Sequence, residues 1–262
     1  MLLTIKDPDL TEIFTKPILD TLLRRSTAVE KLFVTLLCIL FLVPAPTFVF
    51  AENSSTEEMF KKSFPNNKFE SIKPTSIKGM YEVYTGNQIY YYMPEAEVLI
   101  YGSIISKDGV NITRESNIKK IAAKMATLPL ESALKIGEGK ITVVEFMDPD
   151  CYHCRLAYKF FSQRQDVTIY VFFFPLSQVS ERKIRHILCA KDKLKMYEDV
   201  LTGKFDNNAP LNICTDKKVD ETVKTHMRLA SQTGIRATPL FYIKGHVVDG
   251  FEASAIEKLL KD

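Results

Sequence analysis

The chain has 262 residues, of which 46% are hydrophobic and 26% are charged, and its net charge is +3. These proportions are typical of a folded protein with one or two domains. The small net charge and the scattered Lys and Arg residues argue against a nucleic-acid partner, and five cysteines are too few for a small disulfide-stapled protein.

The N-terminal part reads as an export signal. A short apolar run, Leu32–Val43, follows three basic residues and precedes a small-residue cleavage pattern that ends at Ala51. We therefore predict that residues 1–51 are an N-terminal extension and signal peptide, with cleavage after Ala51 and a translation start near Val29. If Thr47–Ala51 is added to the apolar run, the stretch is long enough to span a membrane, so an anchored form stays open.

Residues 52–114 are predicted to form a small α+β domain. The capping-box pattern Ser55–Glu58 begins a short helix that ends before Pro65. Two hairpins follow, each with a turn dipeptide between β-rich runs: Met80–Thr85 and Gln88–Met93 around Gly86-Asn87, and Val98–Ser106 and Val110–Thr113 around Asp108-Gly109. A sheet of this size has a marginal core, which favours a partner surface; an embellishment packed on the next domain is the alternative.

Residues 115–137 are predicted to be a helical linker. Apolar residues recur at three- and four-residue spacing from Ser116 to Lys135, with an interruption at Pro129. Residues 138–262 then alternate strands and helices: strand Ile141–Met147, helix Tyr152–Arg164, strand Thr168–Phe174, helical stretch Val179–Leu201, helix Val219–Gln232, strands Leu240–Ile243 and Val247–Asp249, and helix Ala253–Leu260.

The motif Cys151-Tyr152-His153-Cys154 follows the first strand of this last segment and opens its first helix. Unpaired N–H groups and the positive end of the helix dipole favour the thiolate of Cys151, and the thiolate is the nucleophile of thiol–disulfide exchange. Cys154, one helical turn later, is near enough to attack a mixed disulfide and release the substrate. We assign Tyr152, between the two cysteines, to substrate binding.

The dipeptide Thr238-Pro239 opens a later strand. A cis peptide bond there would place the Thr238 backbone where it can pair with a substrate strand beside Cys151. We therefore assign Thr238 and Pro239 to substrate binding; an ordinary trans proline at a strand start is the alternative.

Two further residues are candidates for tuning the cysteines. Glu145 lies inside the apolar strand before the motif, and a buried unpaired carboxylate is costly, so it should be neutral, paired or linked to water. We favour a proton relay from Glu145 to Cys154 over an acid at a strand edge that faces water. His153 can carry positive charge near neutral pH and so stabilise the Cys151 thiolate, or it is a solvated surface residue.

No metal and no cofactor are expected. A CxxC motif could form half of a zinc site, but zinc needs a second close pair of ligands. Cys189 and Cys214 are far apart in the sequence, and His186, His226 and His246 form no suitably spaced pair.

Taken together, these features resemble the DsbC/DsbG family of periplasmic disulfide isomerases, which belongs to the thioredoxin superfamily. The likeness rests on the exported two-domain layout, the CxxC motif after a long strand, Thr238 before the proline, and the segment Leu188–Lys193 with Cys214 as a possible partner. The fold class that the resemblance implies is α+β: a C-terminal thioredoxin fold with a helical insertion (138–262), a helical linker, and a cystatin-like dimerisation domain (52–114).

The resemblance also implies a V-shaped homodimer, a cis Pro239, a structural disulfide between Cys189 and Cys214, and a membrane-bound, DsbD-like reductase that keeps the active pair reduced. The predicted function is a periplasmic disulfide isomerase or reductase that acts on unfolded or misoxidised exported proteins. Two alternatives stay open. One is a DsbA-like oxidase, which the His153 and Glu145 patterns favour, and the other is a non-enzymatic holdase whose cleft binds unfolded chains. The tyrosines at 90–92 are interpreted as sheet-face residues, with one of them lining such a cleft as the alternative.

Overall fold

The computed structural model describes residues 49–86, 88–207 and 209–261, and residues 55–262 form one compact unit. The predicted signal peptide therefore lies outside the described residues, apart from its last three. Those three belong to a helix that begins at Val49, six residues before the helix expected from the capping box at Ser55. Within the described residues, no helix is both long enough and apolar enough to cross a membrane.

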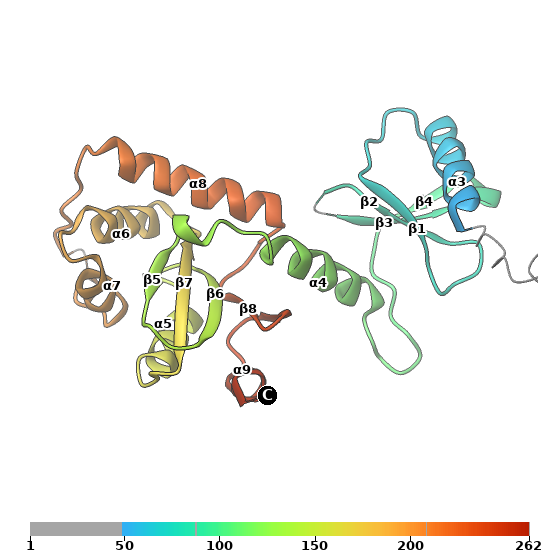
Figure 1. Cartoon of the computed structure of the whole chain (residues 1–262). Helices are drawn as coiled ribbons and strands as arrows, with labels where there is room; N and C mark the ends of the chain where they lie inside the picture. Colours follow the sequence, from blue (N-terminus) through green and yellow to red (C-terminus); the bar gives the residue numbers. More distant parts are fainter. Residues whose placement is uncertain (1–48, 87, 208, 262) are drawn as a thin grey trace, which may run out of the picture. The chain divides into compact units, whose positions relative to one another are not determined.

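The N-terminal part is a helix packed on a small antiparallel sheet. Its elements are α3 (Val49–Ser63), β1 (Ser71–Pro74), β2 (Tyr81–Tyr84), β3 (Ile89–Met93) and β4 (Val98–Ile100). The strands lie in the order β1-β2-β3-β4 (Figure 1). The hairpin predicted around Gly86 is confirmed, because Tyr84 of β2 pairs with Ile89 of β3.

Aromatic side chains fill both faces of this small sheet. On one face Phe60 of α3 packs edge-on against Tyr92, with ring centroids 5.1 Å apart. On the other face Tyr91 is buried, and its hydroxyl lies 2.6 Å from Thr113 Oγ1. The alternation of Tyr91 and Tyr92 between the two faces follows from the two-residue period of a strand.

The second predicted hairpin is largely wrong. The strand expected at Val98–Ser106 ends at Ile100, and only an isolated bridge joins Ile105 to Asn111. Residues 110–113 are no strand, because the side chain of Asn111 accepts a hydrogen bond of 2.8 Å from Arg114 N and caps a helix. This helix, α4 (Ile112–Met125), starts four residues before the predicted linker helix.

The linker helix is also shorter than predicted. α4 ends at Met125, before Pro129, since the residue that precedes a proline is disfavoured in a helix. The rest of the predicted helix forms a 3-10 turn, Leu130–Ser132, and the short strand β5 (Leu134–Ile136), which pairs antiparallel with β7 (Val167–Phe173).

The C-terminal part has the thioredoxin arrangement that the sequence predicted. Its further elements are β6 (Ile141–Met147), α5 (Tyr152–Phe161), β7 (Val167–Phe173), α6 (Gln178–Cys189), α7 (Lys193–Leu201), α8 (Lys217–Thr233), β8 (Leu240–Ile243), β9 (His246–Asp249) and α9 (Ala253–Lys261). The sheet order is β5-β7-β6-β8-β9, with β6 and β7 parallel (Figure 1). The predicted helical stretch 179–201 splits in two because Asp192 caps α7.

The central strand β6 contributes to two apolar clusters on opposite faces of the sheet. Val143 and Met147 face the cluster that contains α5, α6, α7 and α9, whereas Val144 and Phe146 face the cluster with Leu229 of α8. Glu145 lies between Val143 and Met147, so its side chain points to the face covered by α5. That face also holds Cys154.

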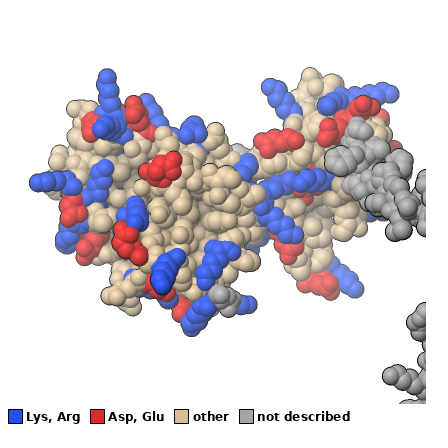
Figure 2. Space-filling view, viewed as in Figure 1, with Lys and Arg blue, Asp and Glu red and all other residues tan. Residues whose placement is uncertain are grey.

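The surface carries charges of both signs. Figure 2 shows Lys and Arg interspersed with Asp and Glu over the visible face, rather than gathered in one patch. Many are paired, such as Arg164 with Asp166 at 2.8 Å and with Glu257 at 2.6 Å. Mixed and paired charges of this kind give small local fields rather than one strong field.

Candidate active site

Cys151 is a half-buried free thiol at the N-terminal end of α5. Its Sγ atom donates a hydrogen bond of 3.3 Å to the carbonyl oxygen of Thr238. The residue stands just outside the helix, where the first N–H groups of α5 have no partner within the helix. The placement expected from the sequence, a thiol at a helix N-terminus, is therefore present.

Cys154 is a second free thiol and is completely buried on α5. Burial raises the pKa of the Cys154 thiol, and the nearby Glu145 carboxyl raises it further. Cys154 therefore stays protonated near neutral pH, and it needs a proton acceptor before it can act as a nucleophile.

The Thr238–Pro239 peptide bond is cis, as the resemblance implied. Pro239 is buried, and Thr238 Oγ1 is buried without a hydrogen-bond partner. The two residues inside the motif lie outside the core. Tyr152 is 69% exposed, and His153 is also exposed. Their rings stand edge-on to each other, with the ring centroids 5.4 Å apart. The motif thus presents one thiol, an aromatic ring and an imidazole toward solvent.

Glu145 is buried, with 3% of its surface exposed. It lies on the central strand β6 and pairs with Val171 of β7 and Phe241 of β8, so the alternative of a strand-edge acid facing water is wrong. Its Oε1 atom has no hydrogen-bond partner. Burial raises the pKa of Glu145 to about 8, which makes the neutral form dominant at pH 7.

The turn before Cys151 is held by a residue that the sequence analysis missed. Asp148 is buried, and its two carboxylate oxygens accept hydrogen bonds of 2.6 Å from the backbone N–H groups of Asp150 and Leu176. One carboxylate therefore joins the active-site turn to the loop that leads into α6.

A cluster of four charged side chains lies behind the same turn; we call it the Asp150 cluster, and its members are Asp150, Arg155, Lys183 and Asp206. Lys183 is buried and contacts Asp150 at 2.5 Å and Asp206 at 2.7 Å. Arg155 binds both carboxylate oxygens of Asp206, at 2.6 and 2.8 Å. In the sequence, the two acidic residues of Asp148-Pro149-Asp150, directly before the motif, could have suggested that basic side chains pair with this turn.

The remaining cysteines and a buried histidine have structural contacts. Cys189 and Cys214 are bonded, with their Cα atoms 5.7 Å apart, which is the pairing that the resemblance implied. His226 Nδ1 accepts a hydrogen bond of 3.0 Å from Phe173 N, and its Nε2 lies 2.7 Å from Ser132 O. Among the described residues, no group of three or more His, Cys, Asp or Glu side chains is placed to hold a metal ion.

Two family models match this chain. Residues 47–114 match the disulfide bond isomerase protein N-terminal domain, and residues 130–262 match the thioredoxin-like domain. The chain is a thioredoxin-like protein of the DsbC/DsbG family.

Relatives of this DsbC-family chain carry matching names. It is 29% identical to the "Probable thiol:disulfide interchange protein DsbC" of Bordetella avium over 72% of this chain and 67% of that protein, and thus spans about two thirds of its length. It is 28% identical to "Thiol:disulfide interchange protein DsbC" of Escherichia coli over 71% of this chain and 78% of that protein. A disulfide interchange protein structure from Neisseria gonorrhoeae, 27% identical, covers 51% of this chain and 96% of its own, with a TM-score of 0.43.

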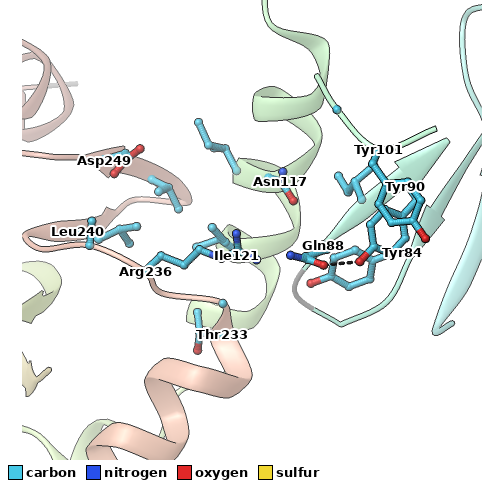
Figure 3. A pocket seen from close by; sticks show the side chains of 16 residues that line it. Tyr84, Gln88, Tyr90, Tyr101, Asn117, Ile121, Thr233, Arg236, Leu240 and Asp249 are labelled. Atoms are coloured by element: carbon cyan, nitrogen blue, oxygen red, sulfur yellow. Dashed lines mark hydrogen bonds between the residues drawn. The ribbon is translucent and has the colours of Figure 1, made fainter. Parts of the chain in front are cut away.

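This DsbC-family chain also has a pocket of about 460 Å³ beside the segment that leads into Thr238 (Figure 3). Arg236 and Ala237 line it, together with residues of α4 and of the small sheet. Tyr90 is part of the lining, and its hydroxyl donates a hydrogen bond to the side chain of Gln88. The ring centroids of Tyr90 and Tyr101 are 4.5 Å apart. Of the three tyrosines at 90–92, only Tyr90 lines this pocket, and Tyr91 and Tyr92 are buried.

Proposed function

We propose that this protein isomerises or reduces non-native disulfides in exported proteins, with Cys151 as the attacking thiolate and Cys154 as the resolving thiol. One observation carries the proposal. A free, accessible Cys151 stands at the start of α5 beside the backbone of the cis Thr238–Pro239 segment, and a free Cys154 is buried one turn behind it. This arrangement pairs a reactive sulfur with a backbone that can align an extended client chain.

The exchange runs through a mixed disulfide. The Cys151 thiolate attacks one sulfur of the client disulfide, a new S–S bond forms, and the other client sulfur leaves as a thiolate that takes up a proton. In isomerisation, a client thiolate then attacks the mixed disulfide or another client disulfide, and Cys151 is finally expelled as a thiolate. In reduction, Cys154 attacks Cys151 Sγ instead, so the client leaves with two electrons and the pair becomes a disulfide.

Cys154 must lose its proton for the reductive branch. Glu145 is the buried carboxyl on the same face of the sheet, and its pKa of about 8 means that a fraction is ionised near neutral pH. We assign Glu145 the role of proton acceptor for Cys154. His153, which is exposed beside Cys151, favours the thiolate when its imidazole is protonated.

Assembly and location complete the proposal. The chain is exported to the periplasm by residues 1–51, dimerises through residues 52–114, and carries its catalytic domain at 138–262 after a linker at 115–137. The exposed Val98 and Ile100 on the edge strand β4 support association at that edge. Because the reductive branch oxidises the cysteine pair, a membrane-bound thiol reductase of the DsbD kind must return two electrons to it.

An oxidase is the second candidate, and Glu145 together with His153 favours it. A stabilised Cys151 thiolate makes the Cys151–Cys154 disulfide a stronger oxidant. Such an enzyme would begin each cycle as the disulfide and would pass it to reduced clients.

The deciding experiment is reactivation of scrambled ribonuclease in a glutathione buffer. We expect the wild type to restore activity, Cys151→Ala to restore none, and Cys154→Ala to keep part of the isomerisation while losing insulin reduction. If Cys151→Ala matched the wild type, thiol exchange would not be the function. If both variants only slowed the aggregation of unfolded clients, as the wild type did, the protein would be a holdase.

A further inference from the structure

Three large apolar side chains lie exposed at the start of α5 and at the entry to α6. Tyr152 is 69% exposed, Leu176 is 55% exposed and Val179 is 57% exposed. Tyr152 directly follows Cys151, whereas the other two lie after β7, at the entry to α6. We call Leu176 and Val179 the α6 shoulder. Single exposed apolar residues are ordinary on a protein surface, so what matters is how the shoulder is attached to the thiol site.

The first attachment runs through Asp148. This buried carboxylate accepts the Leu176 N–H through one oxygen and the Asp150 N–H through the other. The backbone oxygen of Asp148 also accepts a hydrogen bond of 3.1 Å from Cys151 N. Leu176 and Cys151 are therefore fixed to the same residue, on neighbouring loops.

The second attachment runs through Asp150, the residue before Cys151. Its carboxylate accepts hydrogen bonds from Ser180 Oγ at 3.3 Å and from Lys183 Nζ at 2.5 Å, and both donors lie on α6 just after Val179. Lys183 is buried, and breaking a buried ion pair leaves an uncompensated charge. The start of α6 is thus held against the loop that presents Cys151.

From these two attachments we propose that the α6 shoulder is a docking surface for client chains that carry a large apolar side chain beside the cysteine under attack. This inference rests on the proposed function, because it assigns part of the client's binding to the reaction at Cys151. An unfolded or misoxidised client exposes apolar side chains that a native protein buries. The shoulder is continuous with the thiol site through Asp148 and Asp150, so a client joined to Cys151 reaches it with its neighbouring residues.

Recognition of this kind adds selectivity without changing the sulfur chemistry. The backbone of Thr238 can bind any extended chain, since it contacts only main-chain atoms. Contact with Leu176 and Val179 depends on the client's side chains, and an apolar contact of this size changes rates by about tenfold. Clients with exposed apolar segments near a cysteine are then processed first.

The test uses two short peptides, each carrying one cysteine in a mixed disulfide with glutathione. The cysteine is flanked by Leu and Phe in one peptide and by Ser and Gly in the other. We measure the rate at which the reduced full-length protein releases glutathione from each. The wild type should react about tenfold faster with the apolar peptide. The variant Leu176→Ser/Val179→Ser should lose this preference and keep its rate on the polar peptide.

The matched control is Leu194→Ser, which removes another exposed leucine, on α7. It should behave as the wild type on both peptides. The unchanged rate on the polar peptide shows that the double variant is folded and that its thiol is intact, and Val179→Ser alone gives the same readout if the double variant is unstable.

Two results would overturn the inference while leaving the proposed function in place. One is an equal rate of the wild type on the two peptides, and the other is an equal loss on both peptides in the double variant, which would make the shoulder a support for the thiol. A wild type that reacts with neither peptide would instead overturn the proposed function, and the inference with it.

Discussion

The thiol of Cys151 donates a hydrogen bond of 3.3 Å to the carbonyl oxygen of Thr238, 87 residues later in the chain. This contact joins the residue that should react to the residue that should align the client. A client strand that pairs with the Thr238 backbone is therefore delivered next to the reacting sulfur. The chemistry and the binding of the client therefore meet at one point of the fold.

The first prediction separates the two cysteines. Cys151 is accessible and Cys154 is completely buried, so iodoacetamide near pH 6 should modify Cys151 first. Cys154→Ala should accumulate mixed disulfides with client proteins because the resolving thiol is gone, and Cys151→Ala should trap none. Mass spectrometry of trapped and alkylated peptides checks both points. Preferential alkylation of Cys154 would reverse the two roles.

The second prediction concerns Glu145 and pH. Its folded-state pKa is raised from 4.5 to about 8, so between these values the native state holds a proton that the unfolded state has lost. The free energy of unfolding therefore decreases as the pH rises through this window, by at most about 5 kcal/mol from this residue. In Glu145→Gln this decrease should disappear, and the variant should gain stability relative to the wild type from pH 5 to pH 8.

Urea unfolding at several pH values measures this difference. The exposed residue Glu221 on α8 provides the control, because Glu221→Gln should follow the pH dependence of the wild type. A Glu145→Gln variant with the pH slope of the wild type would mean that the carboxyl is ionised in the folded protein. The variant should also resolve mixed disulfides more slowly at neutral pH if Glu145 accepts the proton of Cys154.

The strands and the helix that carry the active-site residues were predictable from the sequence. The strand β5 and the Asp150 cluster, which lie around them, were not. β6 and the start of α5 follow from an apolar run that ends at a CxxC motif, and β8 from an apolar run after a proline. The sequence predicts helix up to Lys135, whereas residues 134–136 form the strand β5. A run of three residues is too short to show a periodic pattern of apolar side chains, so pairing with β7 decides its conformation. The Asp150 cluster was missed because its contacts are long-range: Lys183 reaches Asp150 across 33 residues of sequence, and Asp206 reaches Arg155 across 51.

The third prediction concerns the bond between Cys189 and Cys214. It closes a loop with a sequence separation of 25, so removing it should lower the free energy of unfolding by about 3–4 kcal/mol on loop-entropy grounds. Cys189→Ala/Cys214→Ala, compared with the wild type by urea unfolding, measures this loss. In the wild type, mild dithiothreitol should open Cys151–Cys154 before this bond. Non-reducing peptide mapping that finds Cys189–Cys214 opened first would contradict the structural role.

The fourth prediction concerns assembly. Residues 52–262 should form a homodimer at micromolar concentration, and residues 136–262 should be monomeric. Since β4 is an edge strand with Val98 and Ile100 exposed, Val98→Lys/Ile100→Lys should shift the dimer toward the monomer. Ile77→Lys, at an exposed apolar residue between β1 and β2, is the control and should stay dimeric. Light scattering that finds a monomeric wild type would contradict this prediction.

The redox state of Cys151 and Cys154 in living cells tests the central claim most directly. An isomerase or reductase begins with a free thiolate at Cys151, whereas an oxidase begins with the Cys151–Cys154 disulfide. Cells that produce the full-length protein are quenched with acid, and their free thiols are alkylated with a reagent that changes gel mobility. We expect the pair to be mostly reduced in the intact dimer and to shift toward the disulfide when β4 is disrupted by Val98→Lys/Ile100→Lys. A pair that is predominantly oxidised in the intact dimer would contradict this expectation and identify the protein as an oxidase.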